Sequence, residues 1–179
     1  MLKLIIAAFL TCLLPLALPA QMEQTADPYE QKFQWRIQQE RLNGVYIPRD
    51  LNDALLTLNR LIDKPSKKKF LSISEEEAAH KLFFSLGRWM THNWSFYDGS
   101  RLSVYLQKMG IYDPGDMSRF LIILLHRSLN KQPLEVKSLA ERFEKQEELR
   151  KKERLLKGTI IYEEKKLIPP PKKGGNQKN

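Results

Sequence analysis

The chain has 179 residues, with 30 Lys and Arg against 21 Asp and Glu and a formal net charge of +9 at pH 7. That length is enough for one domain with an apolar core of its own. The basic excess lies mostly in residues 131–179, which hold 14 basic and 8 acidic side chains, whereas residues 21–130 hold 15 and 13. The overall charge therefore does not indicate a nucleic-acid-binding protein.

Residues 1–20, MLKLIIAAFLTCLLPLALPA, have the pattern of a secretory signal peptide, with Lys3 before an apolar run and Pro19 and Ala20 at a cleavage-like end. We expect cleavage after Ala20 and export to the periplasm or the exterior, with an uncleaved membrane anchor as the alternative. The only cysteine, Cys12, lies in this segment. A cleaved chain therefore has no disulfide, and its stability must come from an apolar core.

After a flexible N-terminus at residues 21–27, the pattern predicts a helix over residues 28–42, PYEQKFQWRIQQERL, with Gly44 as its stop. Asp50 is the predicted cap of a second helix. Four leucines at helical spacing mark its buried face, Leu51, Leu55, Leu58 and Leu61. The lysine-rich residues 64–69 are expected to be a polar connector.

A long helix is predicted from Ser74 to about residue 93. Ser74 and Glu77 form an S-x-x-E capping box. We expect Glu75, Glu76 and Glu77 to be solvated charges in the first turn rather than a metal or acid–base cluster. The apolar stripe of this helix contains Ala79, Leu82, Phe83, Leu86, Trp89 and Met90.

Two more helices follow the turn in FYDGSRL. Ser100 caps the first, which ends at Gly110, and Asp113 with Pro114 begins the second. The sequence RFLIILLHRSL is apolar nearly all round, which is typical of a central, buried helix.

Residues 131–158 are predicted to form a charged helix that packs at its start and then extends into solvent, followed by a basic disordered tail at residues 159–179. Weak contact of this C-terminal arm with an anionic membrane surface remains open. Its interleaved acidic residues and few aromatics make it a poor platform for nucleic acid. The expected fold is therefore all-α, a compact bundle of about five helices over residues 28–130 with the charged helix and tail appended.

Six short motifs follow one another in the middle of the chain, IPxxL at 47–51, GRW at 87–89, NW at 93–94, GSRL at 99–102, DMS at 116–118 and HRxLN at 126–130. Through these motifs, residues 46–130 resemble an uncharacterised bacterial family of domains of unknown function. The resemblance implies a shared domain, but no activity, cofactor or catalytic residue.

The motif-bearing stretch SLGRWMTHNWSFYDGSRL is rich in Arg and Trp. Arg88 and His92 are four apart and share a helix face. Asn93 can adopt a left-handed helix end, after which Trp94 folds back. A cation at a helix start gains nothing from the dipole, so Arg101 should have a specific partner, with Asp98 and Asp116 as the nearest candidates.

These residues either form a structural Arg–carboxylate corner or a recognition surface that binds through Arg and Trp. The predicted recognition surface consists of Arg88, Trp89, His92, Asn93, Trp94, Ser100, Arg101, Asp116 and His126. His80, His92 and His126 do not have metal-ligand spacing, and we expect His126 to be a hydrogen-bonded packing residue. The sequence indicates no catalytic residue, no metal and no cofactor.

The leading hypothesis is an exported, non-enzymatic binding or interaction module for an unknown protein partner or a small anionic ligand. One alternative is an anionic-ligand-binding protein or enzyme that uses Arg88, His92, Arg101 and His126, with Asp116, in one cleft. Another is a structural envelope component that acts through the charged arm.

Overall fold

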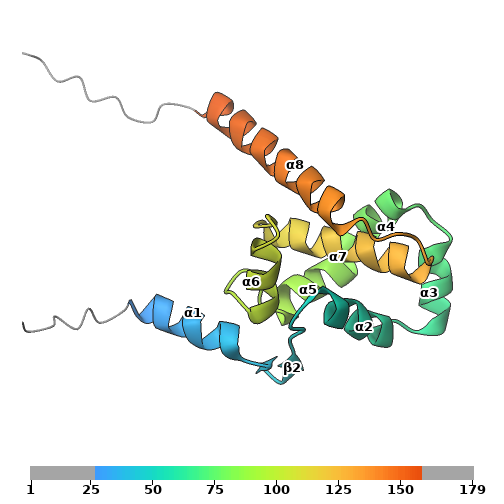
Figure 1. Ribbon diagram of the computed structural model, residues 1–179, viewed down its shortest axis with the longest axis horizontal. Helices are drawn as coiled ribbons and strands as arrows, with labels where there is room; N and C mark the ends of the chain where they lie inside the picture. Colours follow the sequence, from blue (N-terminus) through green and yellow to red (C-terminus); the bar gives the residue numbers. More distant parts are fainter. Residues whose placement is uncertain (1–26, 159–179) are drawn as a thin grey trace, which may run out of the picture.

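The computed structural model describes residues 27–158. The predicted signal peptide, most of the N-terminal segment and the C-terminal tail lie outside the described residues. Within them the fold is all-α, as expected, and the two strands form only a short hairpin. In Figure 1, α7 runs through the middle of the domain, α1 lies at the lower left beside α6, and α8 leaves the domain as an arm.

The helices and strands are short except for the last two helices. In chain order they are α1 (Pro28–Gln38), β1 (Arg41–Leu42), β2 (Val45–Tyr46), α2 (Leu51–Leu61), α3 (Lys64–Leu71), α4 (Glu75–Leu82), the π-helical turn η1 (Phe83–Gly87), α5 (Arg88–Asn93), α6 (Arg101–Gln107), α7 (Pro114–Leu129) and α8 (Val136–Lys157). The segment expected to form about five helices thus contains a larger number of shorter elements. It differs from the prediction at three places: the end of α1, the helix α3 and the turn η1.

The first helix ends at Gln38 rather than at residue 42, so the prediction of its end was wrong. The next residues form the antiparallel hairpin of β1 and β2, in which Asn43 and Gly44 have φ angles of 49° and 79°. Two successive residues with positive φ form the tight turn that matches the twist of paired strands, and Asn-Gly is its preferred sequence. Gly44 therefore turns a hairpin instead of ending a helix.

The lysine-rich segment predicted to be a connector is the helix α3. The Asp63 carboxylate accepts a hydrogen bond from the Ser66 N–H, and Pro65 stands in the first turn, where a missing N–H costs nothing. Phe70 is buried and anchors the helix to the rest of the domain. One apolar side chain and a cap therefore suffice to fold a segment whose other residues are mostly lysine.

The predicted helix from Ser74 to residue 93 is interrupted by the π-helical turn η1, in which the Arg88 N–H bonds to the Phe83 carbonyl five residues back. This turn lies against α7. The Gly87 carbonyl is 2.9 Å from the Thr91 hydroxyl and 3.1 Å from the Ser118 hydroxyl, and the two hydroxyls are 2.7 Å apart. The absence of a side chain at Gly87 permits this approach, because a Cβ there would lie 3.6 Å from the Ser118 Cβ and 3.2 Å from Phe83.

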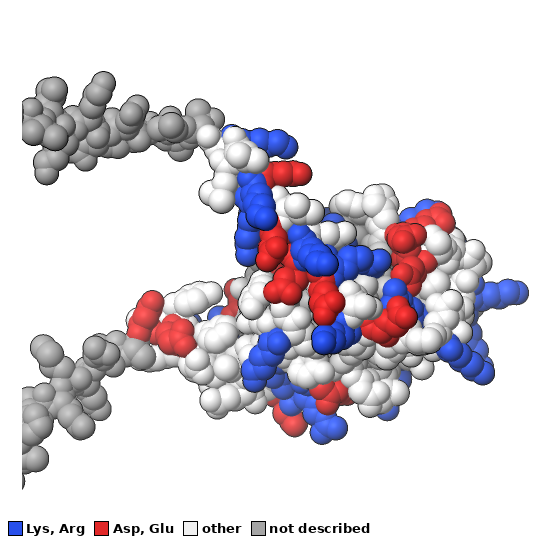
Figure 2. All heavy atoms as spheres, turned by 45° about the horizontal axis from the view of Figure 1, so that its top comes forward, with Lys and Arg blue, Asp and Glu red and all other residues white. Residues whose placement is uncertain are grey.

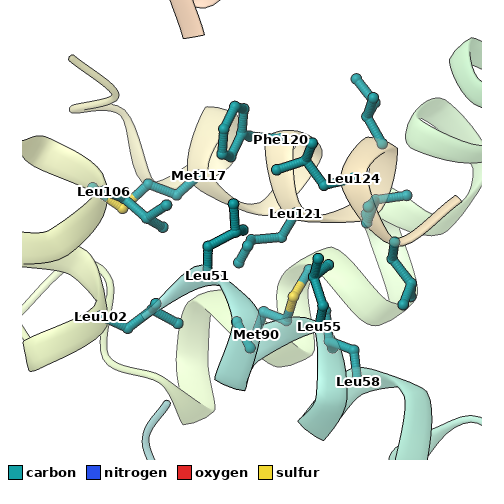
Figure 3. Packing of buried hydrophobic residues seen from close by; sticks show 14 of the residues in the cluster. Leu51, Leu55, Leu58, Met90, Leu102, Leu106, Met117, Phe120, Leu121 and Leu124 are labelled. Carbon is teal, nitrogen blue, oxygen red and sulfur yellow. The ribbon is translucent and has the colours of Figure 1, made fainter. Parts of the chain in front are cut away.

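The core is centred on α7, where every residue from Asp116 to His126 except Arg119 is buried. This confirms the expected central helix. Figure 3 shows side chains of α2, α5, α6 and α7 directed toward one another. The residues it labels are Leu51, Leu55, Leu58, Met90, Leu102, Leu106, Met117, Phe120, Leu121 and Leu124.

The charged helix α8 is held only near its start. Leu139 and Phe143 are buried, and the Phe143 ring packs edge-on against Phe120 at 5.9 Å. Leu155 and Leu156 near the end are exposed. The prediction that this helix packs first and then extends into solvent is confirmed, and Figure 2 shows acidic and basic side chains interleaved along it.

The first helix has no buried residue, and Phe33 and Arg36 are among the side chains that hold it to the domain. The Phe33 ring lies over Gly99, where a Cβ would come within 2.4 Å of the ring. The Arg36 guanidinium donates two hydrogen bonds to the Asp98 carbonyl. The docking of α1 therefore depends on the missing side chain at Gly99.

We expect Gly99→Ala to release α1 from the domain, because the added methyl group displaces Phe33. Amide hydrogen exchange of residues 28–38 should become faster, while exchange in α7 should not change. Gly44→Ala is the matched control, since Gly44 also has positive φ but nothing lies within 4 Å of its Cβ position. The same acceleration in both variants would mean that backbone strain, and not the lost Phe33 contact, is responsible.

Candidate functional site

The structure divides the predicted recognition surface into exposed and buried residues. Arg88 and His92 are exposed on α5, and Trp89 beside them is partly buried. The others are partly or fully buried, and each has its own structural role. They do not form one surface with Arg88.

The two tryptophans stack edge-on with ring centroids 5.7 Å apart, and Trp94 is fully buried. The residue with left-handed backbone is Ser95, at φ 50°, and not Asn93 as predicted. The N–H groups of Ser95 and Phe96 bond to the carbonyls of His92 and Thr91. This is the Schellman arrangement, and it moves the left-handed position two residues beyond the expected one. The Asn93 amide instead bonds to the Trp89 carbonyl at 2.9 Å.

Arg101 has a specific partner, but neither Asp98 nor Asp116 is that partner. Its Nε donates to the Ile47 carbonyl at 2.8 Å, and its Nη1 lies 3.6 Å from Glu40. The guanidinium also lies over the Tyr46 ring, 5.3 Å from the centroid. The side chain thus fixes the hairpin to the start of α6, 54 residues further along the chain.

Asp116 is buried at the start of α7 and binds two arginines. It contacts Arg150 of α8, and it lies 3.2 Å from the Arg119 guanidinium. Burial raises the pKa of the Asp116 carboxyl, although both arginines act in the opposite direction. This carboxylate therefore ties α8 to α7.

His126 is buried near the other end of α7. Its Nε2 lies 2.9 Å from the Ile73 carbonyl, and its ring packs edge-on against Phe70. The expectation of a hydrogen-bonded packing residue is confirmed. His126 follows Asp116 by ten residues of helix, which corresponds to about 15 Å along the helix axis.

Ser100 is buried as the predicted cap of α6, and it shares a capping box with Ser103. The Arg, His and Asp side chains required by the cleft alternative are thus bound to separate partners: Arg101 to Ile47, Asp116 to Arg150, and His126 to Ile73. The described residues do not bring them into one cleft.

One of the three glutamates expected to be solvated is part of an ion pair between helices. Glu75 receives two hydrogen bonds from the Arg127 guanidinium, at 2.7 and 2.9 Å, and Arg127 also donates to the Leu134 carbonyl. The hydrogen bonds from Arg127 lower the pKa of the Glu75 carboxyl. Only its partner 52 residues away distinguishes Glu75 from its neighbours, so local pattern could not identify it.

One concave apolar surface was not predicted from the sequence. It lies where the end of α2 meets α3, α4 and η1, and its cavity volume is about 590 Å³. The apolar residues lining it are Leu61, Ile62, Phe70, Ile73, Leu82 and Leu86. A second hollow of about 430 Å³ shares Leu61, Ile62 and Leu86 and continues to Ser85 and Trp89. We call these two hollows together the apolar groove.

Polar side chains stand at one part of the apolar groove: Asp63, Ser66, Lys69 and Lys81. Lys81 pairs with Glu77 at 2.5 Å. Trp89 is the one residue of the predicted recognition surface that lines the groove, and the Trp94 ring supports it from behind. Sequence pattern marked Leu61 and Leu86 as members of apolar stripes, but it did not show that they line an open concavity.

No group of three or more His, Cys, Asp or Glu side chains in residues 27–158 is arranged to hold a metal ion. Among the same residues, no helix combines the length and the apolar character needed to cross a bilayer.

Comparison with known proteins gives one result. Residues 47–129 contain a domain described as Domain of unknown function (DUF6794). The matched residues begin at Ile47, whose carbonyl accepts the hydrogen bond from Arg101, and end with the last residue of α7. They include the whole apolar groove but neither α1 nor α8. No curated protein matches the chain, and no solved structure does.

Proposed function

We propose that the chain is an exported, non-enzymatic binding module that holds a segment of a partner protein in the apolar groove. The observation that carries this proposal is the groove itself, because large apolar side chains line an open concavity with a few polar groups at its edge. Leu61 lines both hollows and is 52% exposed. Concave apolar surfaces of this kind are typical of binding sites in otherwise solvated domains.

The groove ends at a rigid aromatic anchor. Trp89 is held by the edge-on contact with the buried Trp94 and by the Asn93 hydrogen bond to its carbonyl. Tryptophan is enriched among the residues that carry binding energy at protein interfaces, and it loses little entropy when already fixed. The Arg- and Trp-rich stretch thus supports the proposal through Trp89. Arg88 and His92 are exposed beside it on α5.

Two parts of the proposal rest on the sequence. Residues 1–20 have the signal-peptide pattern and support export with cleavage after Ala20. The order of the six motifs supports a bacterial origin. The separate partners of Arg101, Asp116 and His126 favour a binding function over an enzymatic one, since a catalytic set must converge on one cleft.

Affinity capture with two matched variants tests the proposal. The purified chain, Leu61→Lys and Leu149→Lys serve as baits for an extract of the producing cells. Both leucines are exposed, at 52% and 58%, but Leu149 lies on α8. We expect Leu61→Lys to lose a protein that the other two baits retain. A captured protein retained equally by all three baits, or none captured by a folded wild-type bait, contradicts binding through the groove.

A further inference from the structure

We propose that the occupant of the apolar groove is an acidic amphipathic helix of the partner. This inference rests on the proposed function and goes beyond it by specifying the secondary structure and the charge of the bound segment. Three observations support it: the length of the groove, the character of its walls, and the basic helix α3 along its edge.

The length of the groove matches two helical turns. One wall runs along α4, η1 and α5 from Lys81 to Trp89, eight residues on, or about 12 Å of helix. A bound helix that anchors through positions i, i+4 and i+7 spans about 10.5 Å between its first and last anchors. Three apolar side chains on one face of such a helix can therefore reach along this wall from the Lys81 end to the Trp89 end.

The walls of the groove are themselves helices, and their apolar side chains leave ridges between which a third helix can pack. Leu61 and Ile62 come from the end of α2, Phe70 from α3, and Leu82 and Leu86 from α4 and η1. No unpaired strand borders the groove, since in residues 27–158 the two strands pair with each other in the hairpin. The described surroundings thus favour a helix over an added strand.

The charge at the edge favours an acidic helix. The α3 sequence KPSKKKFL places four lysines on one short helix, and Lys69 lines the groove. Figure 2 shows basic side chains projecting from the edge of the molecule where α3 lies, at the right of the view. Lys81 is already paired with Glu77, whereas none of the ion pairs among residues 27–158 includes Lys69. Asp63 is engaged in capping α3 and offsets only one of these charges.

The same charges disfavour a second copy of this chain as the occupant. Its exposed helix α8 has eight basic and five acidic side chains, so it would add positive charge beside Lys69. An anionic acyl chain is the other ligand that an apolar groove with a lysine edge could accept, and the experiment includes it as a competitor.

The test is a selection from a library of 16-residue peptides on the purified full chain. Every peptide has leucine at positions i, i+4 and i+7, and the remaining positions vary among Glu, Lys, Gln and Ser. We expect the selected peptides to be enriched in Glu over Lys and to become helical when bound. Their affinity should fall about two- to fivefold in Lys69→Glu, the range for one exposed charge pair, and should not change in Lys152→Glu on α8.

Three results would overturn the inference. Equal numbers of Glu and Lys in the selected peptides, or equal affinity for wild type and Lys69→Glu, would exclude the charge preference. Peptides that bind in an extended form would exclude the helix. Displacement of bound peptide by laurate at stoichiometric concentration would indicate an acyl chain as the occupant. The proposed function is judged separately, because Leu61→Lys should still abolish capture of the natural partner when only the charge preference or the helix is excluded, whereas with an acyl chain as the occupant capture of a protein should not depend on Leu61.

Discussion

Trp94→Ala should lower the free energy of unfolding by about 3–5 kcal/mol, the usual loss when a fully buried large aromatic is replaced by alanine. Trp94 is fully buried, and its ring contacts both Trp89 and Phe96. Removal of the Trp94 ring leaves a cavity beneath Trp89, and the apolar area that the ring buried is also lost. Urea unfolding followed by circular dichroism measures the change.

Two further variants make this expectation specific. Trp94→Phe should cost less than half as much, because it keeps an aromatic ring and removes an indole N–H that has no hydrogen-bond partner among the described residues. His92→Ala, an exposed change in the same turn, should stay within about 0.5 kcal/mol of wild type. Similar losses in Trp94→Ala and His92→Ala would show that Trp94 is a surface residue and not part of the core.

Glu75→Gln should lower the free energy of unfolding by about 2 kcal/mol at pH 7, the usual contribution of hydrogen bonds to a charged group. The substitution leaves the guanidinium of Arg127, whose side chain is only 12% exposed, with only the more distant carboxylate of Glu135, at 3.7 Å. The loss should depend on pH. Since Arg127 lowers the pKa of Glu75 below its ordinary value of 4.5, this stabilisation is present above pH 4.5 and disappears as the pH falls through the folded-state pKa.

The difference in the free energy of unfolding between wild type and Glu75→Gln should therefore become smaller as the pH is lowered. Urea unfolding at a series of pH values measures it. Glu77→Gln is the matched control in the same helical turn. Glu77 pairs with Lys81 on the surface, where both side chains are largely exposed, so its loss should be below about 0.5 kcal/mol. A constant difference for Glu75→Gln down to pH 3 would mean that the ion pair with Arg127 does not stabilise the fold.

The local signals in the sequence predict helix starts well. Asp50, Ser74, Ser100 and Asp113 were all predicted to be caps, and each accepts a hydrogen bond from the N–H three residues on. Both partners of a cap hydrogen bond lie within four residues of each other, so a short stretch of sequence is enough to predict the cap. The helix α3 was missed for the converse reason. Its lysines and its proline are typical of a connector, and it depends on burial of Phe70 by distant residues.

The candidate site was much harder to predict. Sequence could state that Arg101 needs a partner but not that this partner is the Ile47 carbonyl, because backbone carbonyls carry no sequence pattern. The ion pair of Glu75 with Arg127 joins residues 52 apart. The apolar groove is a shape between helices, and a leucine that lines a groove has the same helical spacing as one that fills a core. Of the residues in the predicted recognition surface, only Trp89 lines the groove, and it was chosen for its place in an Arg- and Trp-rich stretch.

The π-helical turn has a consequence for insertions and deletions in this domain. Five residues of η1 advance the helix by one wider turn, about as far round the axis as four residues of a regular α-helix. We therefore expect deletion of one η1 residue to be absorbed by a return to regular α-helix, with Trp89 still lining the groove and Thr91 still beside Ser118. A deletion from the regular turns of α4 or α5 rotates every later residue of the helix by about 100°. The wider turn thus makes η1 a place where this helix can lose a residue and keep its groove-lining face.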